Sequence, residues 1–227
     1  MLEVGNIRKF LDQKQILHSL SFSTKDNGII GILGPNGSGK TTLFRILASL
    51  MKPDSGTLVV DGHNLRKMDC TVVFESARCF NLALSVKENY RYWAALKGID
   101  PNAIDEIIET DANYGLAKKL WKNKVGTLSV GEKQILVVLA TLLTDSPILC
   151  LDEPSNGLDI TNLQLLKDII LQQRENRLIL VSSHDVSFIQ EIADRVFIFS
   201  QGTIVREVNN RISYSELSQL YASEVIT

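Results

Sequence analysis

A glycine-rich run that ends in a lysine and a threonine is the clearest chemical motif of this sequence. The run consists of Gly34, Pro35, Asn36, Gly37, Ser38, Gly39, Lys40 and Thr41. It fits G-x-x-x-x-G-K-[ST] in full, between a strand-like segment, GIIGIL, and a helix-like segment, TTLFRILASL. The amides of such a loop, and of the helix start through Thr42, close around phosphate oxygens. We therefore predict a nucleotide-phosphate site in which Lys40 bridges the outer phosphates and the Thr41 hydroxyl ligates Mg²⁺.

Two neighbouring carboxylates follow an apolar run further along the chain. Residues 148–151 predict a buried central strand, and Asp152 and Glu153 stand at its carboxyl end, where α/β sheets place their ligands. Alone, such a strand end is a weak signal, because many are simply solvated. In a chain that also has a phosphate-binding loop, the pair becomes a strong indication of a nucleotide site. Asp152 can hold Mg²⁺, directly or through water, and Glu153 is placed to polarise a water for attack on a γ-phosphate.

Strand-like and helix-like segments alternate through most of the chain, which predicts α/β layering around a largely parallel sheet. The clearest predicted strands are Gly28–Leu33, Val72–Phe74, Ile148–Asp152, Leu178–Ser182 and Val196–Phe199. Shorter strands at Leu2–Ile7 and Thr57–Val60 are expected to form an antiparallel edge.

The stretch from about residue 76 to 145 has a different pattern. Ser85–Glu88 and Ser129–Glu132 each fit a capping box, in which a serine and a glutamate satisfy each other's orphan amides at a helix start. Apolar residues at helical spacing follow both boxes. We therefore expect a mainly helical insert within an α/β core that comprises residues 1–75 and 146–227.

Composition excludes several classes of protein. The 227 residues carry 24 basic and 26 acidic side chains, a formal charge of −2, so nucleic acid is not an expected partner. The hydrophobic fraction of 44% indicates an ordinary globular chain. The longest nearly apolar run, Ile135–Leu143, is far shorter than the ~18–20 residues that span a bilayer, and we expect a soluble chain. Three cysteines without CxxC spacing favour a reducing cytosol.

Further short motifs resemble those of the ATP-binding cassette (ABC) ATPases, over nearly the whole chain. Leu128–Gln134 resembles the family's LSGGQ signature, Glu153–Asp159 the loop after the catalytic glutamate, and Val181–Asp185 the switch-histidine loop. The resemblance implies a P-loop NTPase (RecA-like) core with an antiparallel β edge and an inserted α-helical subdomain. It also implies ATP hydrolysis with ATP and Mg²⁺ as cofactors.

The resemblance implies roles for other residues. In this family two cassettes face head to tail and enclose ATP between the phosphate loop of one and the signature of the other. Ser129 and the amides near Gly131 would then meet the γ-phosphate across the interface. His184 would orient the attacking water, and Phe10 stands where the family carries an aromatic residue that stacks on adenine, although packing in the core is the alternative for Phe10. The expected catalytic residues are thus Glu153, His184 and Lys40.

Several positions depart from the family pattern. Glu75 replaces a glutamine that reaches Mg²⁺, and an ionised glutamate only accepts hydrogen bonds. It is a candidate metal ligand that can also repel the γ-phosphate. Val130 replaces the first glycine of the signature, and Glu132 replaces its glutamine. We expect a working ATPase with unusual kinetics, because the phosphate loop and both carboxylates are kept.

The resemblance favours the ATP-binding subunit of an ABC transporter. The expected partners are a second ABC ATPase subunit, in a homodimer or a heterodimer, and a separately encoded multi-span membrane permease. Cys79–Leu84 lies where the family forms the groove for that permease, and ordinary packing of the helical subdomain is the alternative for this segment. The expected location is cytoplasmic, peripheral on the inner face of the cell membrane, and export is the expected direction by analogy of fold. A soluble ABC ATPase of a cytosolic assembly process, such as iron–sulfur cluster assembly, is the alternative. A nucleic-acid machine is weaker, and a small-molecule kinase leaves the signature and His184 unexplained.

Overall fold

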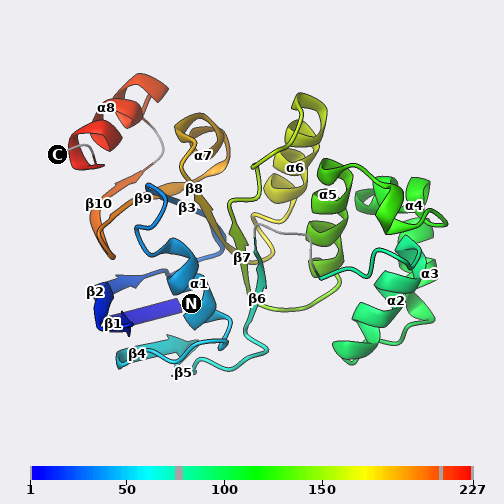
Figure 1. Cartoon of the computed structure of the whole chain (residues 1–227), viewed down its shortest axis with the longest axis horizontal. Coiled ribbons are helices and arrows are strands. Elements are labelled where there is room, and N and C mark those ends of the chain that lie inside the picture. The colour runs from blue at the N-terminus through cyan, green and yellow to red at the C-terminus, as the bar shows by residue number, and fades with distance from the viewer. Residues whose placement is uncertain (1, 75–78, 210–211, 226–227) are drawn as a thin grey trace. The chain divides into compact units, whose positions relative to one another are not determined.

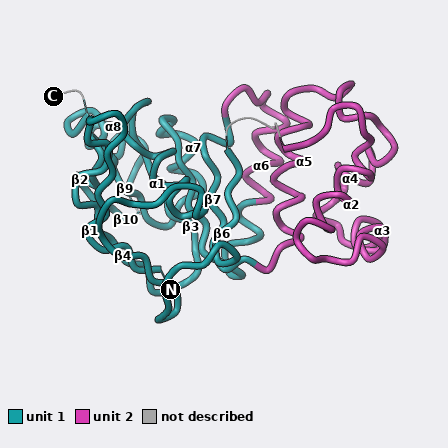
Figure 2. Tube along the Cα trace, turned by 60° about the horizontal axis from the view of Figure 1, so that its bottom comes forward, with its two compact units in different colours: residues 1–74, 146–155, 170–227 teal, residues 75–145, 156–169 magenta. Residues whose placement is uncertain are grey.

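The computed structural model describes residues 2–74, 79–209 and 212–225 (Figure 1). The chain divides into two compact units, which are described separately (Figure 2). Unit 1 comprises residues 1–74, 146–155 and 170–227, and unit 2 comprises residues 75–145 and 156–169. The limits that the sequence predicts for the helical insert, about residues 76 and 145, stay a prediction.

The strands belong to unit 1. They are β1 (Leu2–Leu11), β2 (Lys14–Ser23), β3 (Gly28–Leu33), β4 (Ser55–Val60), β5 (His63–Asn64), β6 (Cys70–Val73), β7 (Ile148–Asp152), β8 (Leu178–Ser183), β9 (Arg195–Ser200) and β10 (Thr203–Asn209). Within the described residues they form a six-stranded sheet of order β10-β9-β3-β8-β7-β6 and a four-stranded sheet of order β2-β1-β4-β5. The six-stranded sheet is parallel from β9 to β6 and antiparallel only at β10. The smaller sheet is antiparallel throughout.

The α/β layering predicted from the sequence is confirmed, and β3 and β7 have the predicted bounds. Every residue of these two strands is buried, so each appears in the sequence as a short, continuous apolar run. Strands β2 and β10 were not predicted. Neither strand is a continuous apolar run or a regular alternation of polar and apolar residues. β2 has only two buried residues and β10 has none, which gives a weaker signal.

The helices of unit 1 are α1 (Lys40–Leu47), α7 (Val186–Ile192) and α8 (Tyr214–Val225). Helix α1 buries Leu43, Phe44 and Leu47 in a core that also takes Ile30 and Ile32 from β3 and apolar side chains from the four-stranded sheet. Helix α7 packs on β3 and β8, and α8 packs on α7 and β9. Since β3 and β7 run through this packed core, the residues directly after them are held in fixed positions.

Unit 2 is helical. Its elements are α2 (Val86–Leu96), α3 (Ala103–Thr110), the short 3₁₀ segment η1 (Ala112–Tyr114), α4 (Gly115–Leu120), a second 3₁₀ segment η2 (Val125–Thr127), α5 (Val130–Thr141) and most of α6 (Ile160–Gln172). Both predicted capping boxes are confirmed, at the starts of α2 and α5. The fully buried Tyr90 of α2 donates its hydroxyl to the Leu136 carbonyl of α5 at 2.8 Å, which ties these two helices together.

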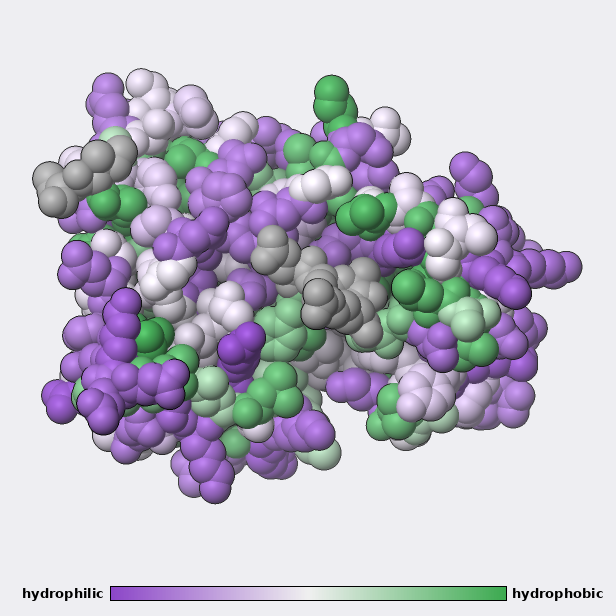
Figure 3. Space-filling view, in the orientation of Figure 1, coloured by the Kyte–Doolittle hydropathy of each residue, from purple (hydrophilic) through white to green (hydrophobic). Residues whose placement is uncertain are grey.

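Apolar side chains are also exposed on each unit (Figure 3). They include Leu50 and Met68 of unit 1, and Leu82, Val130 and Ile160 of unit 2. No helix formed by the described residues has both the length and the apolar composition needed to cross a membrane.

Candidate functional site: a phosphate loop and two carboxylates

The glycine-rich run forms the turn between β3 and α1. Gly39 is the N-cap residue of α1, and its φ of 109° lies in the left-handed region that favours glycine. A glycine offers no side chain to cap the helix, so the first amides of α1 keep their capacity for an external acceptor. The hydroxyl of Ser38 is buried in this loop, and no described residue supplies it with a hydrogen-bond partner. The loop therefore presents donors without acceptors, which suits a phosphate group.

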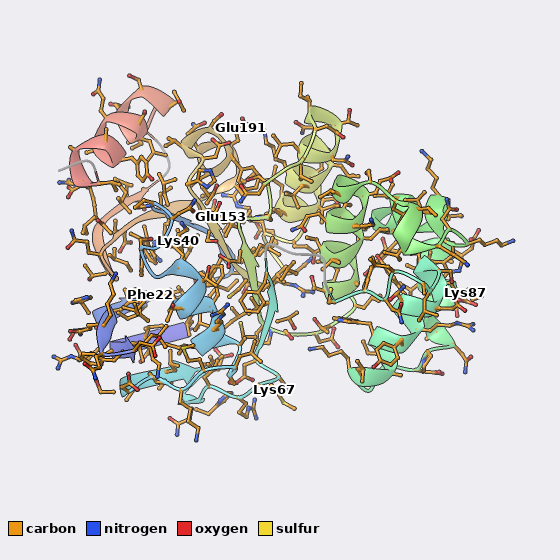
Figure 4. All side chains as sticks on the ribbon, viewed as in Figure 1. Phe22, Lys40, Lys67, Lys87, Glu153 and Glu191 are labelled. Atoms are coloured by element: carbon orange, nitrogen blue, oxygen red, sulfur yellow. The ribbon has the colours of Figure 1, made fainter. Side chains whose placement is uncertain are left out.

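The side chain of Lys40 is enclosed at the start of α1, with 4% of its surface exposed. Its Nζ donates to the carbonyls of Gly34 at 2.7 Å and Pro35 at 3.2 Å. The same Nζ lies 3.0 Å from Oε1 of Glu153, which follows β7 (Figure 4). A buried ammonium group requires such acceptors, and phosphate oxygens are chemically equivalent replacements.

Thr41 and Asp152 bring two oxygen ligands together. The Thr41 hydroxyl donates to Oδ2 of Asp152 at 2.7 Å, and Asp152 is buried. The described residues contain no cluster of three or more His, Cys, Asp or Glu side chains that would form an all-protein metal cage. Mg²⁺ prefers oxygen ligands and usually takes one or two from the protein, with water and phosphate completing its shell. The pair of Thr41 and Asp152 therefore fits Mg²⁺ bound together with a nucleotide.

Glu153 stands at the carboxyl end of the sheet with a strained backbone, since its φ is +49°. Its side chain is buried, and Oε2 lies 2.9 Å from Nδ1 of His184, which follows β8. The imidazole is about half exposed. The Glu153 carboxylate thus lies between the buried Lys40 and the half-exposed His184.

Phe10 lies near the end of β1, with 46% of its surface exposed. Its amide donates to Oδ2 of Asp54 at 2.6 Å, and Nζ of Lys9 lies 2.9 Å from the other carboxylate oxygen. The Phe10 amide, and then Lys9, lower the pKa of Asp54 below its ordinary value. Phe10 pairs with Gln15 across the β1–β2 hairpin. This exposure excludes the core-packing alternative for Phe10, and its stacking on adenine stays a prediction.

The signature residues lie in unit 2, at the start of α5. Ser129 is the N-cap: its Oγ accepts from the Glu132 amide at 3.1 Å, and its amide donates to Oε2 of Glu132 at 2.8 Å. Gly131 is buried so closely against Asn162 that a Cβ would lie 2.7 Å from Nδ2 of that residue. Val130, by contrast, is 69% exposed. A larger residue at 131 would require the Asn162 side chain to shift, whereas the valine at 130 meets no such limit.

The structure thus brings Lys40, Thr41, Asp152, Glu153 and His184 together in unit 1 and places Ser129 and Gly131 in unit 2. The proposed metal ligand Glu75 lies outside the described residues. Sequence reasoning missed Ser182, whose hydroxyl donates to Oδ1 of Asp152 at 2.6 Å. It also missed Asp54. Ser182 lies within the predicted switch-histidine loop, but its contact with Asp152, like that of Asp54 with Phe10, joins residues distant in sequence.

Comparison with known proteins gives the family. A family model described as ABC transporter matches residues 17–156. The ABC transporter ATP-binding protein NatA of Bacillus subtilis (strain 168) is 31% identical over 227 residues, which cover 96% of this chain and 89% of NatA.

Solved structures have the same fold. The ATP binding subunit of an ABC transporter matches with a TM-score of 0.83 and 20% identity, covering 98% of this chain and 99% of that one. A dimeric ATP-binding cassette, solved in a post-hydrolysis state bound to ADP and Pi, matches with a TM-score of 0.76 and 22% identity, covering 94% and 100%. The predicted P-loop NTPase fold is confirmed, and the chain belongs to the ABC transporter family as an ATP-binding cassette ATPase.

Proposed function

We propose that this chain binds Mg-ATP on its phosphate loop and hydrolyses the γ-phosphate with Glu153 as the base. The observation that carries the proposal is the network of Lys40, Glu153 and His184 next to the Thr41–Asp152 pair. Lys40 and the loop amides hold the phosphates, Phe10 stacks on the adenine, and Thr41 and Asp152 hold Mg²⁺. The ion supplies neutralisation of phosphate charge when it is bound.

Nucleotide binding gives Lys40 new acceptors. In the described network its Nζ is occupied by two loop carbonyls and by Glu153. Phosphate oxygens compete for these contacts, and a Lys40 that turns to ATP releases the Glu153 carboxylate to accept a proton from water. His184 then orients that water and the γ-phosphate. The oxygen of the water bonds to phosphorus, the bond to the ADP oxygen breaks, and ADP and phosphate leave.

We further propose that two copies of this chain face each other and that Ser129 and Gly131 of one copy meet the ATP of the other. The dimeric state of a structurally similar cassette supports this arrangement by analogy. The dimer acts at the inner face of the cell membrane, on a separate multi-span subunit, and its direction is export. Recovery of the chain from membranes in complex with a multi-span protein tests that part.

Glu153→Gln tests the catalytic role. The amide cannot accept the proton from water, so we expect turnover to fall by about 100-fold or more while ATP still binds. Size-exclusion chromatography with light scattering should then detect a dimer with Mg-ATP and a monomer without it. Glu191→Gln, on the exposed side of α7, is the matched control and should retain native turnover. A Glu153→Gln variant that hydrolyses ATP at the native rate removes Glu153 from the mechanism.

A further inference from the structure

Ser182 of β8 contacts both carboxylate residues of the site from behind. Its side chain is fully buried, and Ser182 and Asp152 are opposite each other in the parallel pairing of β8 with β7. The hydroxyl donates to Oδ1 of Asp152 at 2.6 Å and accepts from the amide of Glu153 at 3.0 Å. The carbonyl of Ser182 lies 3.2 Å from that amide as a second acceptor. Ser182 thus holds both the Asp152 side chain and the Glu153 backbone amide at the end of β7.

The contact with Asp152 decides which way its carboxylate faces. The two oxygens accept from different hydroxyls, Oδ1 from Ser182 and Oδ2 from Thr41. A hydroxyl has a single proton, and Ser182 commits it to Oδ1. Oδ2 is therefore the oxygen that remains next to Thr41, the other expected ligand of Mg²⁺.

The contact with Glu153 concerns the backbone. A non-glycine residue at φ +49° is strained, and such a conformation persists only where the surroundings hold it. Both acceptors of the Glu153 amide come from Ser182. The neighbouring Ser183 is equally buried, but its hydroxyl accepts from the Asp185 amide at 2.9 Å and serves a different turn.

We propose that Ser182 is a positioning residue of the ATPase reaction, which aims Oδ2 of Asp152 at the nucleotide-bound Mg²⁺ and holds Glu153 in its strained conformation. The inference rests on the proposed function, since it assigns a role within the same site. Residues that orient metal ligands in this way typically change metal affinity or activity by 10–100-fold when they are replaced.

The test separates metal positioning from general stability. Binding of mant-ATP to the purified chain is measured in EDTA and across a Mg²⁺ titration, for the native chain and for Ser182→Ala, Ser182→Cys, Ser182→Thr and the control Ser183→Ala. For Ser182→Ala we expect native affinity in EDTA, within about twofold, and a Mg²⁺ midpoint raised about 10-fold. Ser182→Cys, close in size but a weak donor, should behave like the alanine variant. Ser182→Thr, which keeps the hydroxyl, should return the midpoint to within about threefold of native, and Ser183→Ala should leave it unchanged.

The Ser182 variants can contradict the positioning role of Ser182 in two ways. A native Mg²⁺ midpoint in both Ser182→Ala and Ser182→Cys overturns the proposal, as does a loss of folding in both, because the hydroxyl would then serve stability alone. If Ser182→Ala alone fails to fold, Ser182→Cys carries the test. A native chain that binds no mant-ATP with or without Mg²⁺ contradicts the proposed function itself, which is a separate result.

Discussion

The two helix starts that carry the family's phosphate-binding motifs are built in opposite ways. Helix α1 of unit 1 begins after Gly39, which has no side chain to cap it. Helix α5 of unit 2 begins after Ser129 and closes a complete capping box with Glu132. Both ends carry the partial positive charge of a helix start. Only the start of α5 is already provided with acceptors from its own chain.

Because of this difference, we expect the two helix starts to bind an anion with different affinity. The start of α1 also holds the buried Lys40, whereas the first turn of α5 holds the carboxylate of Glu132. A phosphate at α1 meets open donors and a cation, while one at α5 competes with a serine oxygen and a negative charge. We therefore expect α1 to bind ATP within a single copy, and α5 to contribute only when a second copy presents it to bound ATP.

Replacing Lys40 should give the largest loss of ATP affinity, because it removes the cation from the start of α1, which is the helix start expected to bind phosphate more tightly. For Lys40→Ala we expect the affinity for Mg-ATP to fall by about 100-fold, since hydrogen bonds to charged groups contribute about 1.5–3 kcal/mol. Equilibrium titration with mant-ATP measures this. Lys67→Ala, at an exposed lysine of the same unit, is the control and should bind normally. Undiminished binding by Lys40→Ala would contradict the role of α1.

A charge placed at the start of α5 should separate binding from turnover. Aspartate is as good an N-cap as serine, so Ser129→Asp should keep the thermal stability of the native chain. Its carboxylate would repel a γ-phosphate, and we expect ATP turnover to fall by about 30-fold with mant-ATP affinity unchanged. The same change in the other capping box, Ser85→Asp, should leave both quantities as they are. Reduced mant-ATP affinity of the monomer would mean that α5 acts within its own copy.

Removing the charge of Glu132 should raise the ATPase activity slightly, whereas Ser129→Asp should lower it. Glu132→Gln keeps an acceptor for the Ser129 amide, and it removes a negative charge near the expected phosphate position. We expect kcat/KM for ATP to rise about threefold, while the free energy of unfolding falls by about 0.5 kcal/mol because a favourable helix-dipole interaction is lost. Steady-state kinetics and chemical denaturation measure these quantities. Glu88→Gln at α2 should show the stability change without the kinetic one.

Much of the fold was predictable, and so was most of the network around Lys40 and Glu153, because local patterns mark the residues of both. The apolar runs of β3 and β7 and the serine–glutamate spacing before α2 and α5 define elements within a few residues. Strand β10 was not predicted because none of its residues is buried. The role of Ser182 depends on the pairing of β8 with β7, and no pattern around Ser182 encodes that register. The close contact of Gly131 in α5 with the Asn162 side chain in α6 likewise joins residues distant in sequence, and no local pattern shows it.

A mixing experiment tests the central claim most directly, since it asks whether the two helix starts complete one site from separate copies. Lys40→Ala and Ser129→Asp should each hydrolyse ATP poorly when pure. Half of the dimers in an equal mixture contain both variants, and each of these has one site with a native α1 and a native α5. We therefore expect the mixture to recover about a quarter of native ATPase activity. A mixture that stays as inactive as its components would contradict a site shared between two copies of this chain.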